Sequence, residues 1–71
     1  MITFKRIHSD SKNIVRYEAN SCNEIFIVEF DLNGNCLTDF ENNEMMRSRM
    51  YKVGQKLKYD GFRSSFTYAW Y

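Results

Sequence analysis

The sequence predicts an α+β fold, in which an antiparallel β-meander of about four strands is covered on one face by one amphipathic helix and followed by a C-terminal aromatic strand. Three observations predict this fold. Apolar and polar residues alternate up to about residue 40, then apolar residues recur at helical spacing, and then the alternation returns. Alternation with period two is typical of half-buried strands, and spacings of three and four residues are typical of a helix.

The first two strands are predicted from short alternating segments that are bounded by polar turns. The alternation runs over residues 2–7 and again over 14–19, with polar residues at 8–12 and 20–23. Successive segments of this kind are typical of neighbouring antiparallel strands. We therefore expect the first two strands to pair as a hairpin.

Residues 24–30 form the most apolar segment and are predicted to be the central strand of the sheet. Bulky and β-branched side chains occupy both faces of this segment, which suits a strand with neighbours on both sides. The dipeptide Asn33-Gly34 follows, and it is a strong signal for a two-residue hairpin turn because both positions must take positive φ. This turn predicts a fourth strand over 35–39.

The expected hairpin registers agree on which face of the sheet is buried. They pair Phe4 with Tyr17, Tyr17 with Phe26, and Phe30 with Leu37. All three place the same apolar residues on one face: Phe4, Val15, Tyr17, Phe26, Val28, Phe30 and Leu37. A shift by one residue would turn a strand's side chains to the other face, so this agreement supports the meander.

A helix is predicted over about 42–58. Its apolar stripe has helical spacing and is suited to cover the sheet: Met46, Met50, Val53 and Leu57. The segment 38–41 matches the spacing of a capping box, and Asn42 or Asn43 is an alternative N-cap. Gly61 is expected to end the helix.

The aromatic residues near the end of the chain predict a last strand over 62–71. Phe66, Tyr68 and Trp70 share one face of this strand, and Tyr71 lies on the other. Such a face either belongs to the core or forms an interface, and both interpretations stay open. A homodimer formed through the edge of this C-terminal strand is a further hypothesis.

Composition favours one domain spanning residues 1–71 in the cytoplasm. Hydrophobic residues make up 44% of the chain, enough to order it, and two cysteines are fewer than a secreted domain of this size usually carries. We find neither a signal-peptide pattern nor a segment of about 20 apolar residues, so we expect no membrane contact. The absence of proline beside many Asn, Lys and Ile is typical of AT-rich genomes, such as those of some bacteria and their phages.

Residues suited to catalysis, metal binding or cofactor binding are sparse. His8 is the only histidine and lies in a polar turn, where a solvated role is expected. Cys22 and Cys36 are predicted at opposite ends of the third strand, roughly 20 Å apart. This separation excludes a bridge or a shared zinc ion. We therefore expect a protein that is not an enzyme and has no cofactor or metal.

Charge is distributed unevenly along the chain. Residues 1–44 hold four cations and eight anions, whereas residues 45–71 hold six cations and one anion. An acidic first part and a basic second part can steer association with a charged partner. Alternatively, the two parts neutralise each other within the fold.

The basic helix gives the main functional hypothesis. Cations flank its apolar stripe on both sides, which suits an acidic protein surface or nucleic-acid phosphates, although a merely solvated helix has the same pattern. The expected partner-binding residues are Arg47, Arg49, Lys52, Lys56, Lys58, Arg63, Tyr51 and Trp70.

We expect a small macromolecule-binding protein, namely a standalone inhibitor or adaptor of phage or bacterial type. It would bind a host protein or nucleoprotein through the basic helix. The alternative is a nucleic-acid-binding regulatory protein. The net charge of +1 argues against this alternative, because dedicated nucleic-acid binders are usually strongly basic.

Overall fold

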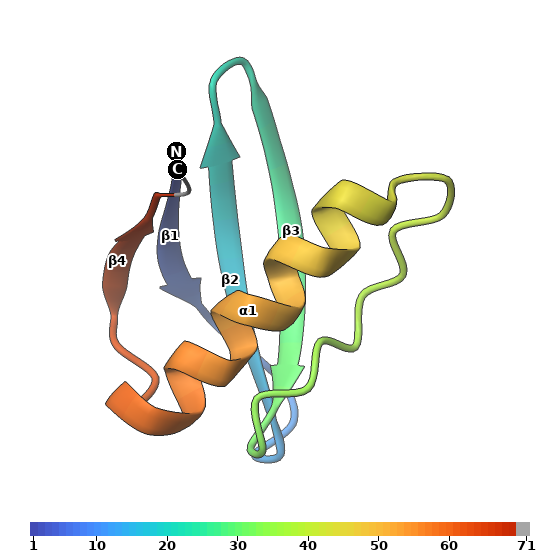
Figure 1. The fold of residues 1–71 in the computed structure, drawn as a ribbon. Helices are drawn as coiled ribbons and strands as arrows, with labels where there is room; N and C mark the ends of the chain where they lie inside the picture. Colours follow the sequence, from blue (N-terminus) through green and yellow to red (C-terminus); the bar gives the residue numbers. More distant parts are fainter. Residues whose placement is uncertain (70–71) are drawn as a thin grey trace.

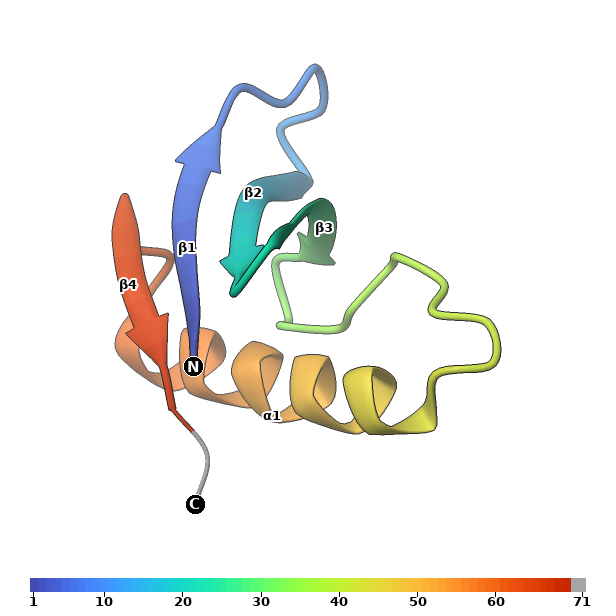
Figure 2. The ribbon, with the colours of Figure 1, turned by 90° about the horizontal axis from the view of Figure 1, so that it is seen from above.

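A four-stranded antiparallel sheet carries one helix on one of its faces (Figure 1). The structure is a computed structural model that describes residues 1–69. The strands are β1 (Ile2–Ile7), β2 (Ile14–Ser21), β3 (Glu24–Asp31) and β4 (Ser65–Tyr68), in the order β3-β2-β1-β4, and helix α1 spans Glu44–Asp60. Figure 2 shows α1 along one side of the sheet, beginning beyond β3 and ending below β4. The predicted α+β fold with one covering helix is confirmed.

The core lies between α1 and the inner face of the sheet. Its buried hydrophobic residues are Ile2, Phe4, Val15, Tyr17, Ala19, Val28, Phe30, Met50, Val53 and Leu57. The predicted stripe of α1 is therefore confirmed, with Met46 partly buried at its N-terminal end. Phe26 is only half-buried, and its ring meets that of Phe40 edge-on at 5.8 Å between centroids.

The C-terminal strand is shorter than predicted, and its aromatic residues pack in the core. β4 pairs antiparallel with β1. Phe66 stacks on Phe4 with 4.6 Å between ring centroids and meets Tyr17 edge-on at 5.2 Å. Tyr68 is half-buried against the same core. The predicted residues Trp70 and Tyr71 lie outside the described residues.

Two of the expected registers are wrong by two residues, but the predicted buried face is correct. Phe4 pairs with Ala19, and Tyr17 pairs with Val28. β2 continues two residues further than expected, to a two-residue turn at 22–23 in which Cys22 has a φ of 55°. A shift of two residues returns every side chain to the same face, which is why the buried face is still correct.

The prediction that residues 24–30 form the central strand is wrong, because β3 lies at the edge of the sheet. The expected fourth meander strand over 35–39 does not form. This segment makes a single β-bridge, between Cys36 and Phe30.

The turn after β3 begins one residue earlier than expected, at Asp31. The Asp31 carboxylate accepts hydrogen bonds from the backbone N–H groups of Asn33 and Asn35, both at 2.9 Å. The Gly34 N–H donates to the Asp31 carbonyl at 3.1 Å, and Gly34 has a φ of 81°. This is a three-residue hairpin loop in which the glycine takes the left-handed position.

The earlier turn reverses the side chains that follow it. Cys36, not Leu37, lies opposite Phe30 and packs against the core. Leu37 is 48% exposed. The predicted pairing of Phe30 with Leu37 is therefore wrong by one residue, the shift that exchanges the two faces.

Both ends of α1 are capped by side chains or backbone groups. The Asn43 side chain accepts a hydrogen bond from the Met46 N–H at 3.0 Å, so Asn43 is the N-cap and the alternatives at 38–41 and Asn42 are wrong. The Gly61 N–H donates to the Leu57 carbonyl at 2.8 Å, and Gly61 ends the helix as predicted. In the part of the chain that the structure describes, no helix has the length and apolar character required to cross a membrane.

Candidate binding surface on helix α1

The outward side of α1 is basic. The helix carries five cations and only two carboxylates, which lie in its first turn and at its last residue, Glu44 and Asp60. Lys52 and Lys56 are exposed, and Tyr59 between them and the C-terminal end is 86% exposed. Because the opposite side of α1 is buried against the sheet, this side is the one available to a partner.

The predicted binding residues do not form one surface, because α1 separates them onto two flanks. Lys56 lies on the flank that faces β4, and Arg63 joins it there. Arg47 and Tyr51 lie on the other flank, along the segment 35–39.

The remaining predicted residues are divided among these regions. The Lys58 side chain begins beside Gly34 and so belongs to the flank that faces the turn after β3. Arg49 is half-buried. Trp70 lies outside the described residues.

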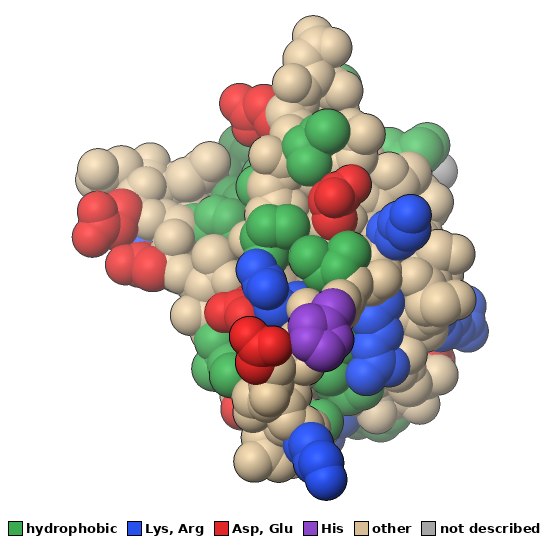
Figure 3. Space-filling model, turned by 180° about the vertical axis from the view of Figure 1, so that it is seen from behind, with side chains coloured by type: hydrophobic (Ala, Val, Ile, Leu, Met, Phe, Trp, Pro, Cys, Tyr) green, Lys and Arg blue, Asp and Glu red, His purple; other side chains and the backbone are tan. Residues whose placement is uncertain are grey.

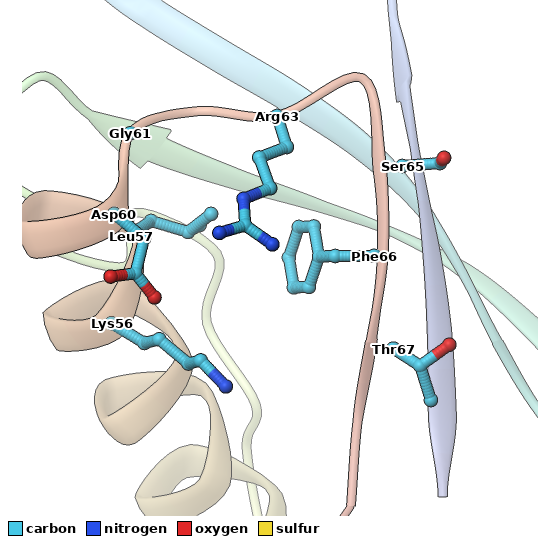
Figure 4. Close-up of a pocket in the computed structure, with 8 residues that line it drawn as sticks. All are labelled: Lys56, Leu57, Asp60, Gly61, Arg63, Ser65, Phe66 and Thr67. Atoms are coloured by element: carbon cyan, nitrogen blue, oxygen red, sulfur yellow. The ribbon is translucent and has the colours of Figure 1, made fainter.

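A pocket of about 150 Å³ opens between the C-terminal end of α1 and β4 (Figure 4). The helix, the connection after it and the strand all contribute to its lining, which consists of Lys56, Leu57, Asp60, Gly61, Arg63, Ser65, Phe66 and Thr67. Gly61 ends the helix here, and a side chain at this position would meet no atom within 4 Å. The pocket is thus bordered by an open backbone on one side and by an aromatic ring on the other.

The charged side chains in this pocket face a common space. Figure 4 shows the Arg63 guanidinium between the Leu57 side chain and the Phe66 ring, and the Lys56 ammonium directed toward the same side. Asp60 also lines the pocket, and the side chains of Ser65 and Thr67 point away from it. Two cations against one carboxylate leave the pocket with a positive charge, which suits an anionic group.

Hydrogen bonds from the sheet fix the connection that carries Arg63. The Tyr17 hydroxyl donates to the Arg63 carbonyl at 2.7 Å. The Arg6 side chain donates to the Phe62 carbonyl at 3.2 Å, and the Arg6 N–H donates to the Ser64 carbonyl at 2.8 Å. Three successive carbonyl groups are therefore held, which limits the positions that the Arg63 side chain can reach.

Tyr17 is a positioning residue that the sequence did not reveal. Burial raises the pKa of its hydroxyl, and the nearby charge of Arg6 lowers it by a smaller amount. The hydroxyl therefore stays protonated and remains a donor at neutral pH. The alternation of apolar and polar residues over 14–19 correctly predicted that Tyr17 lies in the core. No local pattern indicates a hydrogen-bond partner 46 positions away.

The other flank of α1 borders an open groove of about 400 Å³. Arg47 forms an exposed ion pair with Asp39 at 3.6 Å, so its charge already has a partner. Cys36 is half-buried in this groove, and burial raises the pKa of its thiol, which donates a hydrogen bond to the Thr38 carbonyl at 3.6 Å. This flank is the weaker candidate for binding an anion.

The histidine and the two cysteines lie in turns or beside the edge of the sheet. His8 is exposed in the turn after β1 and lies 3.1 Å from Asp10, in agreement with the expected solvated position. Cys22 and Cys36 lie at opposite ends of β3, as predicted. Within residues 1–69, no three His, Cys, Asp or Glu side chains are grouped so that they could hold a metal ion.

No family model matches the chain, and comparisons with curated proteins and with solved structures give no significant match. The chemistry of the surface is therefore the basis for a functional proposal.

Proposed function

We propose that this chain is a small non-catalytic binding protein, an inhibitor or adaptor that occupies an acidic surface of a partner protein or nucleoprotein. The outward side of α1 makes the contact, and one carboxylate of the partner enters the pocket between α1 and β4. On this proposal the chain works in the cytoplasm, where both cysteines remain thiols.

The observation that carries the proposal is that Lys56 and Arg63 come from different elements and point into one pocket. Two like charges in one pocket repel each other, which raises the electrostatic free energy. An anion bound between them lowers it. Leu57 and Phe66 add apolar lining to the same pocket. Apolar surroundings strengthen a charge-assisted hydrogen bond to a carboxylate.

The rest of the outward side of α1 suits a protein partner. Tyr51 is 62% exposed, and Tyr59 is more exposed still. Tyrosine is enriched among the residues that contribute most to protein interfaces, since it supplies contact area at a small cost in conformational entropy. The surrounding cations increase the rate of encounter with an acidic surface.

Nucleic acid is the second candidate partner, and the exposed ring of Tyr59 is the observation that favours it. Tyr59 lies three positions after Lys56 and seven after Lys52, so the three residues share one side of α1. An exposed ring beside cations can stack on a base while the cations bind phosphates. Asp60 in the pocket and the net charge of +1 argue against this candidate.

The two candidates are separated by affinity purification with the tagged chain from a lysate, with and without nuclease. We expect the partner to remain bound after nuclease treatment. The recovered partner is then titrated at two salt concentrations against the wild type and against the double variant Lys56→Glu with Arg63→Glu. The double variant is expected to bind at least about tenfold more weakly, because attraction becomes repulsion.

Lys12→Glu is the matched control for the single variant Lys56→Glu, because it reverses one exposed charge in the turn before β2, away from the pocket. Circular dichroism checks folding, since exposed charge changes usually alter stability by less than about 0.5 kcal/mol. Equal affinity of the folded double variant and the wild type would contradict the proposal. Loss of the partner after nuclease treatment, together with a steep salt dependence, would favour nucleic acid.

A further inference from the structure

Half of the outer edge of β3 has no neighbouring strand. The Glu29 carbonyl points to this edge, where it accepts a hydrogen bond from the Leu37 N–H at 2.8 Å. Backbone groups of alternate residues in a strand point to the same edge, so those of Ile25 and Ile27 point there too. In the described part of the chain, no strand pairs with these two residues on this edge.

This open stretch, residues 24–27, carries the charge of Glu24 but no lysine, proline or bulge. Edge strands are normally short, or carry lysine, proline or a bulge. Ile25 and Ile27 instead expose 65% and 37% of their surface on the outer face of the sheet. Figure 3 shows hydrophobic side chains gathered in the middle of that face, among acidic and basic ones. β4, at the opposite edge, has only four residues.

The chain itself covers only the second half of β3. Cys36 lies opposite Phe30, and the Thr38 hydroxyl accepts a hydrogen bond from the Glu29 N–H at 2.9 Å. Beyond Thr38 the chain leaves the edge, because the Phe40 ring packs on the inner face against Phe26.

One symmetric register with a second copy of this chain does not fit the open stretch. Symmetric antiparallel pairing that places Ile25 opposite Ile27 of the copy would continue with the copy's turn at 22–23 opposite residues 29–30. Residues 36 and 37 already occupy those positions. A linear segment that turns away after four residues does not meet this obstacle.

The charges around the open stretch are negative. Glu24 belongs to the stretch, Glu41 follows Phe40, and Glu18 lies beside Ile27 on β2 with Lys5 of β1 opposite it. All three carboxylates are exposed, and none is in an ion pair within residues 1–69. The nearby cation of β2, Arg16, is already paired with Glu29 at 3.2 Å. This surplus favours an occupant that carries lysine or arginine.

We propose that residues 24–27 of β3 bind an extended, basic segment of a partner protein as a fifth strand of the sheet. Apolar side chains of that segment pack on Ile25 and Ile27, and lysine or arginine residues between them face Glu24. Backbone hydrogen bonds supply most of the affinity, as in other cases of strand addition. The contact is small, so an isolated segment binds weakly. The site lies apart from the pocket beside β4, and either can fail without the other.

The probe is a short capped peptide of alternating lysine and valine, titrated against the intact chain by NMR. We expect it to shift the resonances of residues 24–27 and to slow hydrogen exchange at the Ile25 and Ile27 amides. Two comparison peptides test the chemistry. Replacing lysine by glutamate, or methylating the valine nitrogens at unchanged charge, is expected to weaken binding at least about tenfold.

A pair of variants tests the strand edge itself. Ile27→Pro removes one outward N–H, and proline is tolerated on an edge strand because the hydrogen bonds to β2 do not use that group. Ile27→Thr shortens the same side chain but keeps the N–H. We expect the proline variant to bind the probe at least about tenfold more weakly than the threonine variant.

Three results would overturn the proposal. One is an absence of amide protection at Ile25 and Ile27 at saturating probe. Another is equal binding of the lysine and glutamate peptides, which would remove the preference for a basic segment. The third is a dimer in sedimentation velocity whose dissociation exposes the Ile25 and Ile27 amides to exchange, which would make a second copy the occupant.

Discussion

Gly34 and Gly54 are in contact, so the turn after β3 lies against the middle of α1. A Cβ atom on either residue would collide with the carbonyl oxygen of the other. This contact explains a glycine inside a helix, where it costs roughly 1 kcal/mol relative to alanine. The close approach holds the segment after β3 against the helix that presents the candidate binding surface.

We expect Gly54→Ala to lower the free energy of unfolding by about 1 to 3 kcal/mol, because the collision outweighs the gain in helix propensity. Chemical denaturation measures the change. The same collision is expected to destabilise Gly34→Ala, and Gly61→Ala is its matched control, since both glycines have positive φ but only Gly34 has a neighbouring atom within 4 Å. A Gly54→Ala variant more stable than the wild type would show that the two backbones are not in contact.

Tyr17→Phe is expected to destabilise the fold by about 1 kcal/mol, the usual contribution of one hydrogen bond. The Arg63 carbonyl loses its donor, so the connection over 61–64 should also become more mobile, and an acidic partner should bind more weakly. Thermal melting and backbone NMR relaxation measure the two effects. Lower stability with unchanged relaxation at 61–64 would mean that Tyr17 does not position Arg63.

Stability should fall in acid partly because of Asp31. Hydrogen bonds from the Asn35 side chain and backbone and from the Asn33 backbone lower the pKa of its carboxyl group in the folded state. A lowered pKa gives stability that is present above the unfolded value of about 3.9 and is lost as pH falls through the folded value. Denaturation curves should therefore show less acid sensitivity below about pH 4 for Asp31→Asn. Identical pH profiles would contradict this.

The two cysteines should react at different rates in the folded protein. Cys22 is exposed at the turn before β3, whereas Cys36 is half-buried and burial raises the pKa of its thiol. Because the thiolate is the reactive form, a thiol reagent at neutral pH should modify Cys22 first and Cys36 at a comparable rate only after unfolding. Mass spectrometry of partly modified protein reads the order. Faster modification of Cys36 would place that thiol outside the groove.

The periodicities predicted the fold well, because a strand buries alternate residues and a helix buries residues that are three or four positions apart. The inward residues of β2, such as Val15 and Tyr17, were identified although the registers were wrong, since a shift of two residues preserves the face. The stripe from Met46 to Leu57 was identified for the same reason. The sequence allowed an N-cap at the capping box over 38–41, at Asn42 or at Asn43, since local sequence does not decide which residue lies at the helix end.

The position of β3 could not be predicted in the same way. Its apolar residues on both faces suggested a central strand, but Ile25 and Ile27 are outward at an edge. The turn after β3 differs from the prediction because of Asp31. Its carboxylate accepts hydrogen bonds from backbone N–H groups of the turn, so the chain reverses direction before Asn33. Side-chain hydrogen bonds of this kind compete with turn propensity, and the dipeptide signal does not include them.

The sequence predicted which residues belong to the candidate site, but it did not predict where they come together. Lys56 and Arg63 were identified by their charge, but their convergence depends on the path of the chain after Gly61. That path is fixed by Tyr17 and Arg6, which lie on other strands. Long-range contacts of this kind leave no periodic pattern in the sequence.

The most direct test of the binding pocket compares two substitutions. Lys56→Gln removes a positive charge from the pocket, and Asp60→Asn removes a negative charge. The measurement is the affinity for a fluorescent oligoglutamate peptide at low salt, by anisotropy. We expect Lys56→Gln to weaken binding by about threefold to tenfold and Asp60→Asn to strengthen it by a similar factor, because one removes attraction and the other removes repulsion. Affinities that change in the same direction, or not at all, would contradict an anion-binding pocket between α1 and β4.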